Sequence, residues 1–311
     1  IYNALISVDD LDLANQLSFY LLIFILGLFV LENLSRKKAQ YHSPAKGSFK
    51  KKSKSILKGY KAVLAFSFCA LIFFISFLFP VLQMLYWTII FPKHLADLNL
   101  IELFFNTTIL VFLSSIVLIS FAFISNYGNR LSKSKFLEIL TTFSISGYAI
   151  PGIILAVAFI TFISWFDNNI VAYFKLETIK SIFIGSIIGL VVVYFIRFYS
   201  LASNGIKSGY LKISYSIDES AYLLGYSKFK TFKDIHIPYL KNSILLIGIL
   251  IAIEIIKELP ITLIMRPFNF ETFATQAYIY ASQDLLEAAA APSLFLILIA
   301  SFFILITSRY I

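Results

Sequence analysis

The stretch DESAYLLGYSKFKTFKDIHIPYLKNSILLIGILIAIEII, residues 218–256, combines two kinds of sequence. Its first half is charged and is interrupted by Gly225, whereas its second half is almost continuously apolar. The apolar run, which continues to residue 263, is close to the roughly 20 residues that a helix needs to cross about 30 Å of hydrocarbon. The stretch therefore predicts a membrane-spanning helix that is preceded by a compact polar segment.

Apolar runs of this kind recur along the chain and set its fold class. Mean hydropathy is +0.85 and only 14% of the residues are charged, which excludes a soluble globule of this size. Because lipid cannot satisfy backbone hydrogen bonds, each run is expected to be helical. Pro80 and Pro151 should kink or end the helices that contain them. We predict an all-α polytopic helical bundle with about seven transmembrane helices, at 15–34, 61–91, 103–125, 138–165, 179–202, 241–263 and 291–309.

Basic residues gather in the loops on one side of this predicted bundle. Residues 36–61 hold ten of the 26 Lys and Arg of the chain, and residues 197–241 hold seven more. Because Lys and Arg are enriched in cytoplasmic loops, we expect residues 203–240 and the carboxy terminus in the cytoplasm, and residue 1 outside. Proximity to anionic lipid explains the lysines, so we predict a lipid bilayer and no nucleic acid as their partner.

The polar half of the opening stretch predicts two short helices with a turn between them. Ser216 and Glu219 have the S-x-x-E spacing of a capping box, and Gly225 suits the left-handed end of a helix. Ser227 can cap a second short helix, and Pro238 is expected to block its continuation into the next span. Taken by itself, this is an amphipathic hairpin at the membrane surface that connects two spans.

The spacing within the hairpin resembles the E-A-A-x3-G-x9-I-x-L-P signature of permease subunits in binding-protein-dependent ABC importers. Serine replaces the first alanine of the signature, and isoleucine replaces its leucine. The resemblance implies a MetI-like permease bundle in which residues 214–238 form the coupling helix. The residues that match the signature are Glu219, Ser220, Ala221, Gly225, Ile235, Ile237 and Pro238.

The same resemblance implies the partners and the location of the protein. A permease of this kind sits in the bacterial inner (cell) membrane, where its coupling helix docks on a cytoplasmic ABC ATPase dimer. It receives its substrate from a soluble substrate-binding protein, periplasmic or extracellular. It is a transport subunit and no enzyme, so we expect no catalytic residues and no cofactor, with ATP hydrolysis in a separate subunit. In agreement, the chain contains no G-x4-G-K-[ST] motif.

Two further stretches resemble ferric-iron permeases of this family. KELPITLIMRPFNFETFATQAYIYAS, residues 257–282, looks like their outward-facing end, and residues 2–26 look like the junction between their two homologous halves. The implied substrate is ferric iron, with thiamine, phosphonate or polyamine as alternatives. The implied partner is a missing first permease half or a second permease subunit. The implied domains are the last transmembrane helix of a preceding half at 1–35, a basic cytoplasmic linker at 36–60 and a six-helix permease domain at 61–311.

EIIKELP, residues 254–260, places three ionisable groups near the outer end of the predicted sixth span. Glu254, Lys257 and Glu258 are three and four residues apart, so a continuing helix would carry them on one face. A bare carboxylate costs roughly 2.5–3.5 kcal/mol at the centre of a span, so these groups should face protein or water. One explanation is an ion pair that makes insertion tolerable. The other is a translocation path, in which Pro260 ends the helix and Arg266 follows in the exposed loop.

A secondary transporter or channel with its own ion coupling is the alternative function, with the same three charges as an internal relay. The sequence leaves any metal ligands unknown, because the three histidines are scattered and H-E-x-x-H is absent. His236 lies inside the hairpin, where a packing role is favoured over proton chemistry. Cys69 is the single cysteine, which excludes a disulfide framework and favours plain packing.

Overall fold

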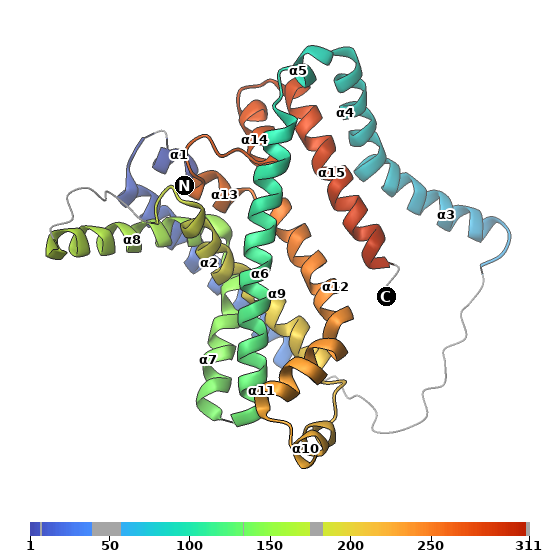
Figure 1. Ribbon diagram of the computed structural model, residues 1–311. Helices are drawn as coiled ribbons and strands as arrows, with labels where there is room; N and C mark the ends of the chain where they lie inside the picture. The colour runs from blue at the N-terminus through green and yellow to red at the C-terminus, as the bar shows by residue number, and fades with distance from the viewer. Residues whose placement is uncertain (7, 39–56, 133, 175–182, 309–311) are drawn as a thin grey trace.

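The computed structural model describes residues 1–6, 8–38, 57–132, 134–174 and 183–308. Every regular element in these ranges is a helix, which confirms the all-α prediction (Figure 1). Six of the helices described are long and apolar enough to cross a membrane, and a bent pair of helices is a further candidate. This agrees with the predicted number of about seven, although residues 179–182 and 309 of the predicted spans lie outside the described ranges.

The candidate spans follow the predicted order. The short helix α1 (Tyr2–Ile6) precedes the first span, and other short helices connect the spans at α5 (Pro92–Ala96), α10 (Tyr215–Leu223), α13 (Pro260–Met265) and α14 (Phe273–Ser282). The spans are built from α2 (Leu11–Lys38); α3 (Tyr60–Phe73), η1 (Phe74–Leu78) and α4 (Phe79–Ile90); α6 (Leu100–Ser132); α7 (Lys135–Ile145), η2 (Ser146–Ala149) and α8 (Gly152–Phe174); α9 (Ile187–Tyr210); α11 (Lys228–Thr231), η3 (Phe232–His236) and α12 (Ile237–Ile256); and α15 (Leu286–Ser308).

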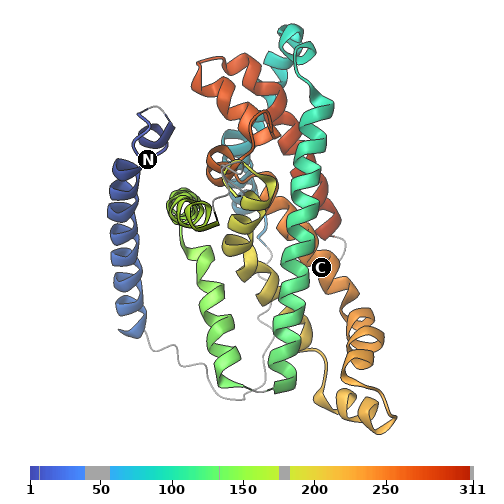
Figure 2. The same ribbon diagram turned by 60° about the vertical axis from the view of Figure 1, so that its left-hand side comes forward.

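The main core lies where α6, α9 and α12 pack together. Its largest fully buried side chains include Leu118, Tyr194 and Phe198. Glycine lets α9 and α12 approach closely, because a Cβ on Gly205 would lie 2.5 Å from Cγ1 of Ile247. Figures 1 and 2 show α6 running from the end of the bundle that holds α5 to the end that holds α10 and α11.

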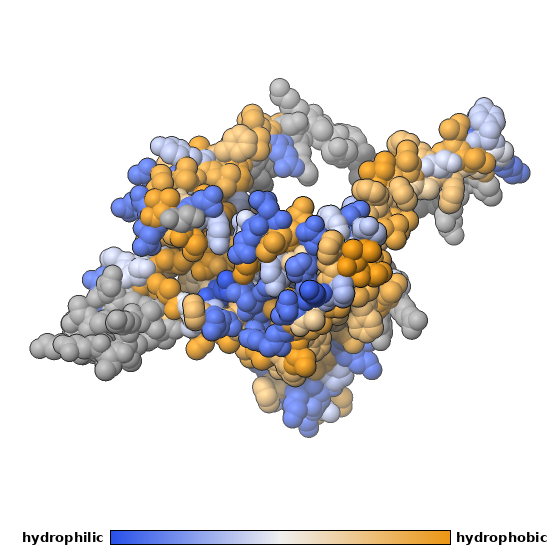
Figure 3. All heavy atoms as spheres, turned by 90° about the horizontal axis from the view of Figure 1, so that it is seen from above, coloured by the Kyte–Doolittle hydropathy of each residue, from blue (hydrophilic) through white to orange (hydrophobic). Residues whose placement is uncertain are grey.

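Much of the outer surface is apolar, as a lipid environment requires. No residue of α3 or α4 is buried, and large side chains such as Phe66 and Phe112 are exposed. In the end-on view of Figure 3, hydrophilic residues form a patch in the middle with hydrophobic residues around it. Such a distribution is typical of a helical membrane protein.

Prolines act differently at three positions. The helix break predicted at Pro151 is confirmed, because the helices on either side of residues 150–151 are at an angle of 115° to each other. Pro80 and Pro238 lie within continuous helical runs, each just after a π-turn, in η1 and η3. At Pro80 the run is kinked, as predicted, since α3 lies at an angle to α4 (Figure 1). A proline ring clashes with the carbonyl four residues before it, and the wider π-turn relieves that clash. The predicted break at Pro238 is therefore wrong, and helix continues from Lys228 to Ile256.

Candidate functional site

The candidate site begins with residues 215–236, called the surface segment here, which comprises α10, α11 and η3 at one end of the bundle. Ser214 is the N-cap of α10, and its side chain accepts a hydrogen bond from the Ser216 amide at 3.3 Å. Helix α10 therefore begins before Ser216, and the predicted capping box of Ser216 with Glu219 is wrong. Ser216 instead lies in the first turn, where its hydroxyl is 2.7 Å from that of Ser214.

A Schellman turn ends α10, as the glycine predicted. Gly225 has φ +81°, a left-handed conformation that glycine adopts without a steric cost. Its amide donates to the Tyr222 carbonyl, and the Tyr226 amide donates to the Ala221 carbonyl, both at 3.0 Å. The predicted cap of the second helix is confirmed, since Ser227 accepts from the Lys230 amide at 3.2 Å. Two capped helices with a tight turn thus form a compact hairpin.

The outer face of this hairpin is apolar and exposed. Leu223, Leu224 and Phe229 are 90%, 79% and 73% exposed. Leu223 and Leu224 come directly before Gly225 and Phe229 comes four residues after it, so one partner that binds at the turn could cover all three. An exposed cluster of this kind next to charged residues is typical of a protein-binding surface.

The residues that match the permease signature divide between this face and the interior. Ala221 is buried, and Ile235 is half-buried. The exposed members are Glu219, Ser220, Gly225, Ile237 and Pro238.

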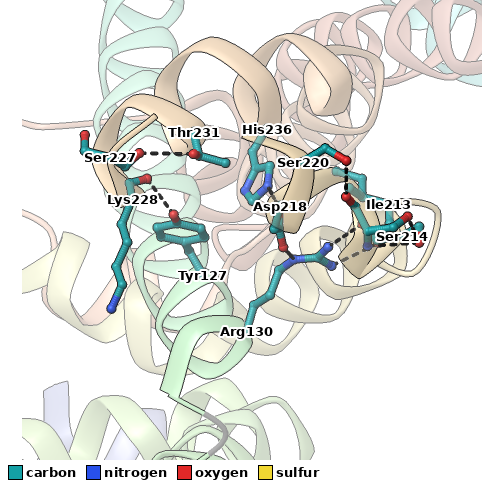
Figure 4. Close-up of polar contacts among 11 residues, drawn as sticks. Tyr127, Arg130, Ile213, Ser214, Asp218, Ser220, Ser227, Lys228, Thr231 and His236 are labelled. Atoms are coloured by element: carbon teal, nitrogen blue, oxygen red, sulfur yellow. Dashed lines mark hydrogen bonds and ion pairs between the residues drawn. The ribbon is translucent and has the colours of Figure 1, made fainter. Parts of the chain in front are cut away.

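Beneath the hairpin lies a buried cluster of charges that sequence reasoning missed (Figure 4). Arg130, near the end of α6, places its Nε 2.7 Å from Oδ2 of Asp218, and these two side chains are only 7% and 9% exposed. The other carboxylate oxygen of Asp218 is 2.7 Å from Nε2 of His236. Arg130 also donates to the carbonyls of Ile213 at 3.1 Å and Ser214 at 3.0 Å. The cluster therefore joins α6, both ends of the surface segment and the residues that lead into α10.

Aromatic rings enclose this cluster. The His236 ring packs edge to face against Tyr127 and Tyr210, with centroid distances of 5.2 and 5.4 Å. The guanidinium of Arg130 lies 4.3 Å from the centre of the Tyr215 ring. The Tyr127 hydroxyl donates to the Lys228 carbonyl at 2.6 Å. The packing role expected for His236 is confirmed, and the histidine has in addition an acidic hydrogen-bond partner.

Residues 254–260 form a second candidate site with a different geometry from the predicted one. Helix α12 ends at Ile256, so Glu258 does not continue the face of Glu254 and Lys257. Glu254 and Lys257 pair with each other at 2.7 Å, and the Lys257 side chain is 61% exposed. The prediction that Glu254, Lys257 and Glu258 share one helical face is therefore wrong.

Two further expectations for this region are corrected. Pro260 lies at the beginning of α13 and does not end the preceding helix. Proline suits a first helical turn, because the amide that it lacks would have no helical partner there. Arg266 is half-buried and forms an ion pair with Glu271, so it is not simply exposed in a loop.

Glu258 turns into the core, where it meets Arg197 of α9. Oε2 of Glu258 is 3.4 Å from Nε of Arg197, and the Glu258 side chain is 7% exposed. Oε1 accepts from the Ile261 amide at 3.3 Å. Arg197 also donates to the Ile150 carbonyl at 3.4 Å. Two interruptions of helical structure, at 150–151 and 257–259, therefore meet at one ion pair. Non-helical backbone at membrane depth is tolerated where protein buries it or where it lines an aqueous cavity.

Gly152 provides the space for this pair and leads to a testable prediction. A Cβ at this position would lie 2.4 Å from Nη1 of Arg197 and 2.6 Å from Oε1 of Glu258. We expect Gly152→Ala to push the two side chains apart and to cost about 1–3 kcal/mol of stability. The measurement is the melting temperature of the purified protein in detergent. Gly128→Ala is the control, because a Cβ there meets nothing within 4 Å; equal melting temperatures for both variants would contradict the prediction.

Metal ligation finds no support within the part of the chain described here. No group of three or more His, Cys, Asp or Glu side chains comes together there in a way that could hold a metal ion. The metal ligands that the sequence left unknown therefore stay unassigned.

Comparison with solved structures shows which proteins share this fold. The chain has the fold of the permeases of bacterial ABC importers, and no family model matches it. A bacterial ABC transporter for the import of the acidic polysaccharide alginate superposes with a TM-score of 0.61 at 17% identity, over 80% of this chain and 95% of that chain. The bacterial alginate transporter in complex with an alginate pentasaccharide-bound periplasmic protein gives a TM-score of 0.63 at 15% identity, over 79% and 92% of the two chains.

Comparison with curated sequences points to a particular group of permeases. The Fe(3+)-transport system permease protein FbpB 2 of Haemophilus influenzae is 21% identical over 277 residues. The match covers 88% of this chain and 52% of the relative, so the chain spans about half the length of that protein. The resemblance to ABC importer permeases, and to ferric-iron permeases among them, is thereby confirmed.

Proposed function

We propose that this chain is the transmembrane permease component of an ATP-driven ABC importer, and that its surface segment docks on the ATPase. The observation that carries this proposal is the exposed apolar face of the hairpin, formed by Leu223, Leu224 and Phe229. A docking element needs such a face together with a rigid base. The buried ion pair of Arg130 and Asp218 supplies the base directly beneath it.

Each residue of the signature has a part in this proposed docking. Gly225 sets the turn between the two helices, and Ala221 is the buried residue of the signature in α10. Glu219 and Ser220 are exposed and available to the partner. Ile235, Ile237 and Pro238 lie where η3 continues into α12, so they connect the docked hairpin to a transmembrane helix.

The alternative of a secondary transporter has less support from the geometry. A charge relay needs ionisable groups that follow one another along one path. Exposed Lys257 instead pairs with half-buried Glu254, whereas Glu258 pairs with Arg197 in the core. The three charges of residues 254–258 are thus divided between two separate pairs.

The proposal extends to partners and location. The partners are a cytoplasmic ATPase dimer, a soluble substrate-binding protein, and a first permease half or second permease subunit. The periplasmic protein bound to the alginate transporter supports the second of these, and the 52% coverage of the iron permease supports the third. In this arrangement residues 1–35 belong to the preceding half, 36–60 are the linker and 61–311 are the permease domain. Residues 203–240 and the carboxy terminus face the cytoplasm of a bacterial cell, and the spans lie in its inner membrane.

The proposed translocation path includes the outer end of α12 and the turn that follows it. Glu258 is the acidic group that contributes to cation passage, and Arg197 holds it between transport cycles. Glu254 and Lys257 hold the end of α12, while Pro260 and Arg266 limit α13 at its two ends.

Ferric iron is the proposed substrate, with support from the Fe(3+)-transport permease that the chain resembles. We expect ATP-dependent uptake of radioactive ferric iron into proteoliposomes that contain the full transporter and its binding protein. Competition assays with thiamine, phosphonate and polyamine test the assignment, because these are the alternatives within the same class of importer. Inhibition by a low concentration of one competitor would transfer the assignment to it. Uptake without ATP, driven by an ion gradient, would instead support a secondary transporter.

A further inference from the structure

Arg130 makes three polar contacts at the start of the surface segment and with the residues just before it. Its Nε pairs with Asp218 of α10, and its two terminal nitrogens donate to the carbonyls of Ile213 and Ser214. Three donors in one rigid plane therefore fix both the position and the orientation of the start of α10 relative to α6. A lysine at the same position could keep the ion pair with Asp218. It could not direct three donors in one plane to Asp218 and to the two carbonyls.

The second oxygen of Asp218 extends this connection to another span. It lies 2.7 Å from Nε2 of His236, which is completely buried at the end of η3. Helix α12 follows directly after His236 in an unbroken helical run. Asp218 therefore connects α10 to α6 through Arg130 and to α12 through His236.

This geometry determines how the hairpin can move. A hairpin attached only through its chain ends would tilt on its connections when a partner pushed it. A hairpin held by buried, charge-assisted hydrogen bonds from two spans moves together with both of them. The rings of Tyr127 and Tyr210 pack against His236 and leave its ring little room to move, which limits tilting of the hairpin further.

We propose that Arg130 is a positioning residue that makes the surface segment and α6 move as one body. Asp218 connects this body to α12 through its contact with His236. The proposal rests on the proposed docking function and adds to it the residues that transmit the movement. Neither Arg130 nor Asp218 contributes to the exposed apolar face of the hairpin. Docking and transmission should therefore be separable by substitution.

The first experiment measures the position of the hairpin without the ATPase. Spin labels on Leu223→Cys and Ser132→Cys, in a Cys69→Ser background, report the distance from α10 to the end of α6 in lipid nanodiscs. The distance distribution is expected to be narrow in the parent protein, broad in Arg130→Met, and intermediate in Arg130→Lys. Lys212→Met is the matched control, because its exposed side chain forms no ion pair among the described residues. An equally narrow distribution in parent and Arg130→Met would overturn the proposal.

The second experiment measures transmission in the intact transporter. Arg130→Met should still co-purify with the ATPase, while the stimulation of ATP hydrolysis by the loaded binding protein falls by about 2- to 30-fold. Arg130→Lys should recover part of the stimulation, and Lys212→Met all of it. Stimulation that stays normal in Arg130→Met would overturn the proposal, as would a loss that only parallels a loss of folded protein. If the parent chain itself binds no ATPase, the docking function fails, and the label distances still decide whether Arg130 positions the hairpin.

Discussion

Gly225→Val is expected to abolish uptake and binding-protein-stimulated ATP hydrolysis together, while the protein still reaches the membrane in normal amount. Gly225 has φ +81°, and a β-branched side chain at positive φ costs about 1–3 kcal/mol. The valine can avoid that cost only by leaving the left-handed region. The hydrogen bonds from the Gly225 and Tyr226 amides would then be lost, and the two helices that carry Leu223 and Phe229 would change their relative orientation. Because the turn is at the surface, the transmembrane core should not be affected.

The test compares Gly225→Val with Gly225→Asn at equal membrane levels. Asparagine tolerates the left-handed conformation, and a Cβ at this position meets nothing within 4 Å. Gly225→Asn should therefore retain most of the activity, which makes it a control for the mere presence of a side chain. ATPase association and uptake as in the parent protein for Gly225→Val would show that the turn does not position a docking surface.

The second large effect is expected at the ion pair of half-buried Arg197 with buried Glu258. Removing one partner of a buried ion pair typically costs about 3–5 kcal/mol, because the other charge stays behind without compensation. Arg197→Met should therefore strongly reduce the amount of folded protein. Lys257→Met should have little effect on folding, because the lysine side chain is 61% exposed and an ion pair at a surface contributes about 0–1 kcal/mol. Fluorescence-detected gel filtration of the solubilised variants measures both amounts.

A double variant separates stability from a role in transport. Arg197→Gln with Glu258→Gln replaces two charges by two amides that can still hydrogen-bond to each other, so folding should recover relative to Arg197→Met. Glu258→Gln alone also leaves Arg197 without its partner, so uptake is compared at equal amounts of folded protein; at equal amounts it should be lowered, with ATPase association intact. If Glu258 contributes to cation passage, uptake should stay low in the double variant even where folded protein is abundant. Normal uptake by the double variant would contradict a role of Glu258 in cation passage and would show that the pair is purely structural.

Local sequence determined the helices and the hairpin turn. The apolar runs predicted the spans because a helix satisfies its own backbone in lipid, whatever its neighbours are. Gly225, Ser227 and Pro151 were interpreted correctly because a left-handed turn, a cap and a helix break depend on nearby atoms in the chain. The permease signature likewise lies within one short segment, so its spacing was visible without a structure.

Only the tertiary structure decided which charges meet. Arg130 and Asp218 are 88 positions apart, and no local pattern connects a basic residue at the end of one span with an acid in a later hairpin. Glu258 does not share a helical face with Glu254, because α12 ends at Ile256. The position of Pro260 in the sequence did not predict this helix end. The helix also continued through Pro238, because a π-turn removed the clash on which the predicted break depended. In each case the outcome depends on packing between spans that are distant in the sequence, or on a backbone adjustment that their packing makes possible.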